Sequence, residues 1–212
     1  PLAGGHSIDI PQPIFGLSVT GRVGIGELKK NNGARPGDLL YLTKPLGIGV
    51  IATAMKKELA NDDDTKWALK TMKKLNFEGA ELSGITGVNA MTDITGFGLA
   101  GHLHEMMKAS NCSALIDYDS IPKYNYSRLK ELYSLNCMPT GTTKNYLAYH
   151  KEISKVNGEE LFVLFDPQTS GGLLISVDPK DKSKTETILK KYGPINCIGT
   201  VKDRNEILIS LI

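Results

Sequence analysis

The chain has 212 residues, of which 41% are hydrophobic and 23% charged, and its formal net charge is +2. A chain of this length buries a sizeable core, and a charge this small argues against nucleic acid or a membrane as the partner. No apolar run approaches the roughly 20 residues of a membrane-spanning helix. The three cysteines stand far apart without CxxC spacing, which argues against a disulfide framework or a zinc site and favours a reducing cytoplasm. We expect all three to be buried as small hydrophobic residues: Cys112, Cys137 and Cys197.

The chain begins with a glycine-containing stretch and a first apolar run. The sequence GGHS at residues 4–7 can offer backbone N–H groups, an imidazole and a hydroxyl to a phosphate, although it lacks the GK[ST] of a P-loop. Taken alone, a turn before a strand explains it better. Residues 14–20 predict a strand with no partner nearby. Residues 21–37 are polar, and RPGD at residues 35–38 predicts a turn before the next strand.

The rest of the chain alternates helix and strand patterns. Helices are predicted over residues 48–59, 65–75 (continuing toward 82), 98–109, 126–135, 145–154 and 183–192. Strands are predicted over residues 39–43, 90–92, 113–117, 161–165, 173–177, 195–201 and 206–209. This pattern predicts one α+β domain with a mixed β-sheet packed against helices.

The most informative stretch is DITGFG at residues 93–98. It follows a β-compatible stretch and precedes an apolar helical pattern, with Thr95 able to cap that helix. Asp93 is therefore expected on the connection between them, where a rigid scaffold can aim a carboxylate at a metal or phosphate. Gly96 and Gly98 would let another group approach the backbone closely. The residues alone fit a simpler interpretation equally well, in which Asp93 caps the helix and the glycines only turn the chain.

Other polar clusters have simpler explanations. The acidic run at residues 61–64 precedes a predicted helix and is expected to cap it rather than bind a metal. His102 and His104 are two positions apart on a predicted helix, so they point to different faces and cannot ligate one metal together. The TGTTKN block at residues 140–145 predicts a loop that caps a helix and could line a crevice. The glycines of QTSGG at residues 168–172 predict a tight bend before a strand.

Four blocks together resemble the selenophosphate synthetases (selenide, water dikinases). The run DITGFGLAGHL at residues 93–103 is similar to a motif of that family. The other three follow the family's order across nearly the whole chain: LAGGHSID at residues 2–9 with PIFGL at 13–17, LTKPLGIG at 42–49, and DPQTSGGLL at 166–174. Single blocks also occur in the wider aminoimidazole-ribonucleotide-synthetase-like group, and all four in order favour the selenophosphate synthetases.

The resemblance implies the C-terminal domain of the aminoimidazole-ribonucleotide-synthetase-like fold. Residues 1–21 would then be the tail of a largely missing N-terminal domain that binds ATP and forms the dimer. Residues 22–37 would be a linker, and residues 38–212 the C-terminal α+β domain.

The resemblance also implies an activity: ATP, selenide and water become selenophosphate, AMP and phosphate, with Mg²⁺ and in some members K⁺. It places Gly5, His6 and Ser7 at the ATP and assigns Asp93 to the metal. It implies a cytoplasmic homodimer for the full-length protein, with no nucleic acid or membrane as partner. The family's nucleophile and lysine have no counterpart here, so this chain alone is expected to be inactive and to hold no catalytic residue. The alternatives are another ATP-dependent enzyme of the superfamily, or a non-catalytic binding module derived from one.

Overall fold

A computed structural model describes residues 3–212 of the chain. Its centre is a six-stranded sheet in the order β2-β4-β1-β5-β3-β6. The strands are β1 (Leu39–Leu42), β2 (Val88–Asp93), β3 (Cys112–Ile116), β4 (Leu173–Val177), β5 (Cys197–Asp203) and β6 (Ile209–Leu211). All neighbouring strands run antiparallel except β3 and β6, which are parallel. The predicted mixed sheet is confirmed.

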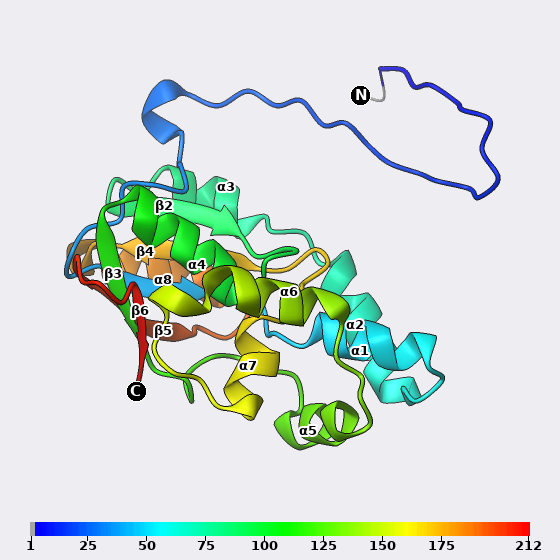
Figure 1. Cartoon of the computed structure of the whole chain (residues 1–212). Coiled ribbons are helices and arrows are strands. Elements are labelled where there is room, and N and C mark those ends of the chain that lie inside the picture. Colours follow the sequence, from blue (N-terminus) through cyan, green and yellow to red (C-terminus); the bar gives the residue numbers. More distant parts are fainter. Residues whose placement is uncertain (1–2) are drawn as a thin grey trace.

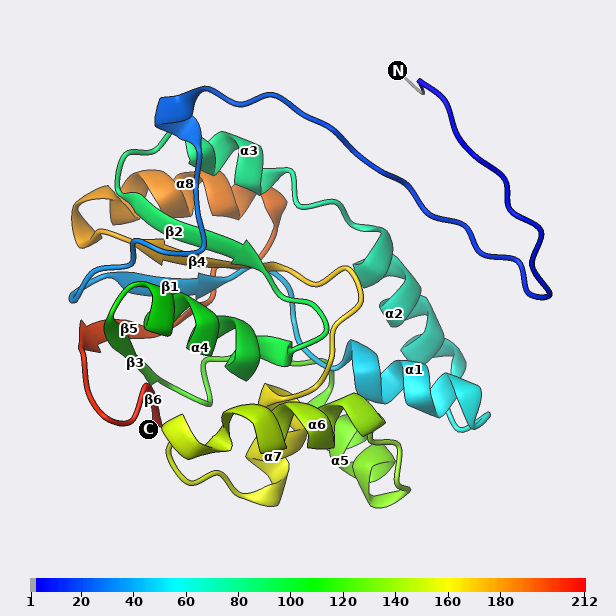
Figure 2. The ribbon, with the colours of Figure 1, turned by 45° about the horizontal axis from the view of Figure 1, so that its top comes forward.

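Helices cover both faces of this sheet (Figures 1 and 2). The α-helices are α1 (Ile48–Lys56), α2 (Asp62–Lys73), α3 (Glu78–Ser83), α4 (Gly98–Ala109), α5 (Tyr126–Ser134), α6 (Thr140–Tyr149), α7 (Gly158–Leu164) and α8 (Lys182–Tyr192). Short 3₁₀ turns lie at Ile25–Glu27, His150–Glu152 and Pro179–Asp181. Figure 2 shows α3 and α8 together on one face, whereas α4, α6 and α7 lie on the other.

Two hydrophobic cores form because alternate strand residues point to opposite faces. In β1, Leu40 and Leu42 join the larger core, whereas Tyr41 joins the smaller core. In β4 every residue is buried, and Ile175 and Val177 pack under α3 and α8 together with Leu189 of α8. The middle of the sheet is therefore covered on both sides, which explains the continuous apolar run of β4.

Most predicted elements are present. The helix over residues 98–109 and the strand over residues 173–177 have the bounds that the sequence predicts. The acidic run caps α2 as expected: the Asn61 side chain accepts from the backbone N–H of Asp64, and the Asp64 side chain accepts from that of Asn61. The predicted RPGD turn is also present, with Gly37 at φ +96°. The long helix predicted toward residue 82 is instead two helices, because the chain leaves helical geometry at Lys74.

The strand predicted over residues 161–165 is wrong, because Gly158–Leu164 forms helix α7. Asn157 caps this helix, and the Glu160 side chain accepts a hydrogen bond from the Asn157 backbone N–H. The helix predicted over residues 145–154 begins earlier, at Thr140, and passes at His150 into a 3₁₀ turn. The block at residues 140–145 is therefore the start of α6 rather than a loop. The last strand lies at Ile209–Leu211 rather than at residues 206–209. Cys112 and Cys137 are buried as expected, whereas Cys197 is exposed.

Residues 3–24 form no helix or strand, so the strand predicted over residues 14–20 is also wrong. Both views show this segment standing apart from the domain (Figures 1 and 2). Its apolar side chains are exposed, with Phe15 and Val19 each at 87%. A strand needs a neighbour for its backbone hydrogen bonds, and none lies beside it here. Within residues 3–212, no helix combines the length and the apolar character that crossing a membrane requires.

Candidate functional site

Four segments that are distant in the sequence meet beside the last residue of β2. They are the β1–α1 connection at residues 43–47, the β2–α4 connection at residues 94–97, the loop at residues 166–172 and helix α6. Backbone hydrogen bonds join two of them: the Ile94 N–H donates to the Gly172 carbonyl and the Gln168 N–H to the Thr95 carbonyl, both at 2.9 Å. The Thr43 N–H donates to the Leu173 carbonyl at 3.1 Å. Three of the four family-like blocks, at residues 42–49, 93–103 and 166–174, are thus spatial neighbours.

Asp93 is the final residue of β2, opposite Leu173 of β4, rather than part of the connection. Its side chain is exposed, whereas the next residue, Ile94, is fully buried. The carboxylate is therefore presented to solvent from a backbone that is fixed on both sides. This arrangement suits a ligand-binding carboxylate, and it provides no cap for α4, whose N-cap residue is Phe97 and makes no side-chain capping bond.

The glycines near Asp93 differ in how closely other atoms approach them. A Cβ on Gly98 would lie 2.9 Å from the Leu164 carbonyl oxygen, and φ is +70° there. A Cβ on Gly171 would lie 2.1 Å from the Ile94 carbonyl oxygen. The group that approaches these glycines is therefore the protein's own backbone. A Cβ on Gly96 would meet nothing within 4 Å, so packing does not require that glycine.

The two histidines of α4 make separate contacts, as their spacing predicts. His102 Nε2 lies 3.1 Å from Thr95 Oγ1, and this contact replaces the helix cap expected of Thr95. Burial lowers the pKa of His102, while the Glu105 and Asp93 carboxylates act in the opposite direction. His104 Nε2 instead lies 2.7 Å from Glu152 Oε2.

Asn145 and Asp166 hold this region together, and sequence reasoning missed both. Asn145 Nδ2 donates to the carbonyls of Gly96 at 2.8 Å and Phe165 at 3.1 Å. Asp166 is fully buried, and its Oδ2 accepts from the Gly49 N–H at 2.9 Å. Their motif blocks were visible in the sequence, but no local signal indicates which member is buried.

Burial raises the pKa of Asp166 to about 7, although hydrogen bonds from Gln168 and from the backbone at the start of α1 act in the opposite direction. Desolvation disfavours the charged form of a buried carboxyl group. Asp166 Oδ1 is also buried and finds no hydrogen-bond partner among the described residues 3–212. An isolated ionised carboxylate is costly in such a place, so the group sits near the balance between its two protonation states at neutral pH.

Lys44 is the second buried ionisable group of this region. Its Nζ donates to the Lys74 carbonyl at 2.6 Å and to the Ser170 carbonyl at 2.7 Å. Burial lowers its pKa, partly countered by Glu78. Lys44 therefore fixes Ser170, a non-glycine residue with φ +51°, and tethers the loop at residues 166–172 to the β1–α1 connection.

The residues expected at the ATP lie elsewhere. Gly5, His6 and Ser7 are exposed on the segment that stands apart from the domain in Figures 1 and 2. Gly5 and His6 line a hollow of about 550 Å³ whose other wall comes from residues 16–20. The structure does not bring these three residues together with Asp93.

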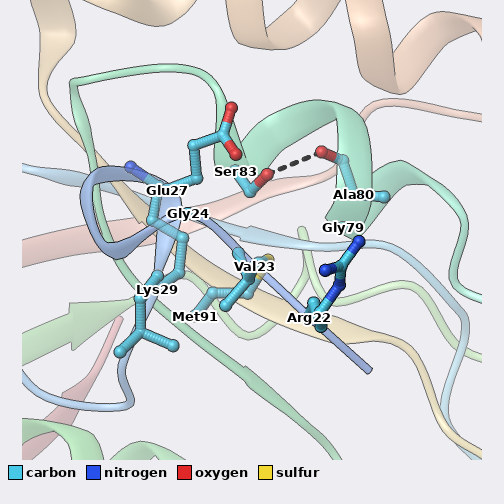
Figure 3. Close-up of a pocket in the computed structure, with 10 residues that line it drawn as sticks. Arg22, Val23, Gly24, Glu27, Lys29, Gly79, Ala80, Ser83 and Met91 are labelled. Atoms are coloured by element: carbon cyan, nitrogen blue, oxygen red, sulfur yellow. Dashed lines mark hydrogen bonds between the residues drawn. The ribbon is translucent and has the colours of Figure 1, made fainter. Parts of the chain in front are cut away.

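A second hollow, of about 770 Å³, lies between the segment at residues 22–29 and helix α3 (Figure 3). Lys29 Nζ donates to the Ile85 carbonyl at 2.7 Å, which attaches this segment to the domain. Met91 of β2 lies in the wall, but Asp93 does not line the hollow. It is a gap beside the domain rather than part of the site around Asp93.

The structure supplies one candidate metal ligand. Within the described residues 3–212, no group of three or more His, Cys, Asp or Glu side chains is arranged to hold a metal ion. Magnesium is commonly held by one or two carboxylates while phosphate oxygens and water complete its shell. Asp93 fits that limited role, because its carboxylate is exposed at a fixed strand end.

A family comparison matches this architecture. Residues 35–211 match the family described as AIR synthase related protein, C-terminal domain, and the chain belongs to that family. Among curated proteins it is similar to the selenide, water dikinase of Shewanella sp. (strain W3-18-1), with 45% identity over 203 residues. The selenide, water dikinase of Shewanella baltica (strain OS185) is 44% identical. Each alignment covers 95% of this chain but 57% of the relative, so the chain spans little more than half the length of these proteins.

Solved structures share the fold. The thiamine-monophosphate kinase of Stenotrophomonas maltophilia K279a superposes with a TM-score of 0.62 at 16% identity, over 89% of this chain and 54% of that one. HypE of E. coli has a TM-score of 0.61 at 18% identity, over 84% and 47%. A structure of the hydrogenase maturation protein HypE in complex with ATP has a TM-score of 0.58 at 16% identity, over 82% and 45%. The expected C-terminal-domain fold is confirmed.

Proposed function

We propose that this chain is the C-terminal part of a selenide, water dikinase, which makes selenophosphate, AMP and phosphate from ATP, selenide and water. The observation that carries the proposal is the 45% identity to a protein of that name along 95% of the chain. The four motif blocks support it further, because three of them meet around Asp93. In this proposal residues 1–21 are the tail of a preceding domain, residues 22–37 the linker, and residues 38–212 the C-terminal domain.

The proposed role of Asp93 is to bind Mg²⁺ together with the phosphate oxygens of ATP. A hard cation bound there would neutralise charge on the polyphosphate. Gly5, His6 and Ser7 are proposed to contact the nucleotide, and their exposure leaves them accessible to it. The remaining ligands, the nucleophile and a site for K⁺ would lie in the part of the protein that this chain does not contain. We propose that the full-length protein is a cytoplasmic homodimer and that this chain alone is inactive.

The test is Asp93→Asn in the full-length protein. The substitution removes the negative charge but keeps the size of the side chain. We expect turnover at limiting Mg²⁺ to fall by about tenfold or more, an effect that even indirect partners of a metal ligand produce. The fold should be unchanged, because the side chain is exposed. AMP formation and circular dichroism measure the two effects, and the 212-residue chain assayed alongside is expected to form no AMP.

The matched control is Asp203→Asn. Asp203 is also an exposed aspartate at the end of a strand. It pairs with Cys112, which follows the end of α4, whereas Asp93 precedes the start of that helix. The control residue is therefore next to the opposite end of α4. Its replacement should leave turnover unchanged. Normal activity of Asp93→Asn at limiting Mg²⁺ would contradict the metal role. A full-length protein that forms no AMP from ATP and selenide would contradict the proposed function itself.

A further inference from the structure

A pair of buried polar side chains connects the region around Asp93 to helix α1. Asp166 Oδ2 accepts from the Gly49 N–H at 2.9 Å and from Gln168 Nε2 at 2.7 Å. Gln168 Oε1 accepts from the Ile48 N–H at 3.3 Å. Both side chains are at least 96% buried, with exposed fractions of 0% for Asp166 and 4% for Gln168. The first two residues of α1 thus donate to side chains that come from more than a hundred positions further along the chain.

We infer that Asp166 and Gln168 are positioning residues. They anchor the Ile94–Phe97 connection to the N-terminus of α1, and the anchored connection holds the carboxylate of Asp93 in a fixed place. The consequence for catalysis rests on the function proposed above. The positioning itself rests only on the contacts described here.

Helix α1 needs this anchor, because its own N-cap residue cannot cap it. That residue is Gly47, which has no side chain and adopts φ +125°. The first N–H groups of a helix have no partner within the helix and must find one elsewhere. A carboxylate at this end is also favoured by the helix dipole. Asp166 and Gln168 therefore perform from a distance the capping that a local side chain normally provides.

The anchor is also tightly fitted. A Cβ on Gly49 would lie 2.3 Å from Asp166 Oδ1 and 2.6 Å from the Pro167 carbonyl oxygen. The absence of a side chain at Gly49 is what lets the carboxyl group reach the helix. The loop cannot slide along α1 without losing both hydrogen bonds from the helix.

On its other side the same loop holds the connection after Asp93. The Gln168 N–H donates to the Thr95 carbonyl, and the Gly172 carbonyl accepts from the Ile94 N–H. One residue, Gln168, therefore contacts α1 through its side chain and the connection through its backbone. No more than two residues separate Asp93 from each of these bonds, so a shift of the loop would be transmitted to its carboxylate.

Hydrogen exchange in the 212-residue chain tests the positioning directly. In Asp166→Ala we expect the Ile94 and Gln168 amides to exchange about tenfold faster, since their loop has lost the anchor. Asp166→Asn keeps an acceptor for the Gly49 N–H and should restore slow exchange at both amides. Gln168→Ala removes the second contact and should act like Asp166→Ala. Amides in β5 and α8 should be unaffected in every variant.

Asp64→Asn is the matched control, because Asp64 is also a fully buried carboxylate that caps a helix, but it pairs with Arg128 and makes no contact with the loop. This variant should accelerate exchange in α2 and leave Ile94 unchanged. Uniform acceleration over the whole chain in Asp166→Ala, or unchanged exchange at Ile94 in all Asp166 and Gln168 variants, would overturn the inference. Failure of Asp166→Asn to improve on Asp166→Ala would overturn the anchoring role of the carboxyl oxygen.

Turnover of the full-length protein separates this inference from the proposed function. If Asp93 binds Mg²⁺, Gln168→Ala should raise the Mg²⁺ concentration needed for half-maximal turnover by about tenfold, with Asp64→Asn unchanged. An unchanged Mg²⁺ requirement in Gln168→Ala, when local exchange is accelerated, would overturn the link to Asp93. If the wild-type protein has no selenide-dependent activity, the proposed function fails, and the exchange experiment still decides the positioning.

Discussion

Among single residues, Asp166 has the clearest consequence for stability. Its pKa is raised to about 7 in the folded chain, whereas an aspartate in an unfolded chain titrates near 4. The folded state therefore binds more protons than the unfolded state between these two values, and the free energy of unfolding decreases as pH rises through that window. In Asp166→Asn this contribution is absent. We expect the stability of this variant relative to the wild type to increase from about pH 4 to about pH 7, by up to about 4 kcal/mol.

Urea denaturation across this pH range measures the effect. Asp64→Asn should show a pH dependence of the opposite sign. Burial raises the pKa of Asp64, but hydrogen bonds from Arg128, the Asn61 backbone and Tyr124 outweigh it and hold this pKa below its usual value. Asp64 therefore stabilises the fold above the unfolded pKa and loses this contribution as pH falls through the folded one. A pH dependence of the same sign for both variants would mean that Asp166 is stably ionised in the folded protein.

Gly49 is a helix residue whose replacement by alanine should be harmful rather than favourable. Alanine is normally favoured over glycine in a helix by about 1 kcal/mol. At Gly49, however, the new Cβ would lie 2.3 Å from a carboxyl oxygen. We expect Gly49→Ala to destabilise the chain by about 1–3 kcal/mol, the usual cost of overpacking. The control is Gly84→Ala, where φ is −74° and the nearest atom is 3.8 Å away, and this change should not be destabilising. Equal unfolding midpoints for the two variants would refute the steric argument.

Among the helices, α2 depends on its capping box. Removing an N-cap side chain typically costs about 1 kcal/mol. We therefore expect Asn61→Ala to lower the free energy of unfolding by about this amount. Asp62→Ala, one residue later, loses only its attraction to the helix dipole and should cost a few tenths of a kcal/mol. Urea denaturation of both variants gives the comparison, and a smaller loss for Asn61→Ala than for Asp62→Ala would show that the cap is not formed.

Helices with a clear amphipathic pattern could be predicted from the sequence, but α7 could not. Residues 161–165 are a continuous apolar run, and periodicity cannot distinguish a buried helix from a buried strand in so short a run. The local signal that would have decided it is the capping box of Asn157 and Glu160. The site shows a similar limit. Local pattern places Asp93 directly after the predicted strand, one residue away from its observed place at the end of β2. The buried side chains of Asn145, Asp166 and Lys44 could not be predicted, because their burial depends on contacts between distant segments.

For the whole molecule, the segment before β1 divides into two parts with different energetic roles. From Ala3 to Gly24 it is exposed almost throughout. Closer to β1 it attaches to the domain: the Lys30 carbonyl accepts from the Met91 N–H, and the Gly33 and Ala34 N–H groups donate to Ser110 Oγ. We expect a chain starting at Gly24 to keep its unfolding temperature within about 2 °C, whereas a chain starting at Arg35 should lose several degrees.

Thermal unfolding and light scattering of the three chains test this division. The exposed apolar side chains before Gly24 should make the intact chain associate at high concentration, since an unpaired extended segment can pair with another copy. Starting at Gly24 should abolish that association. A tight dimer that persists in the chain starting at Arg35 would place the interface within the domain. Equal unfolding temperatures for all three chains would show that residues 29–34 contribute no stability.

The strand order has a consequence for the time course of folding. The central strand β1 pairs with β4 and β5, and the contact between Asp38 and Ser176 beside it joins residues 138 positions apart. Contacts of this kind require a long loop to close before any stabilisation is gained, which slows folding. During synthesis on a ribosome, β1 emerges before β4 and β5 and must wait for both of these neighbours. The nascent chain therefore exposes its apolar strands until the last part of the domain has left the exit tunnel, and that interval is when it depends most on chaperones.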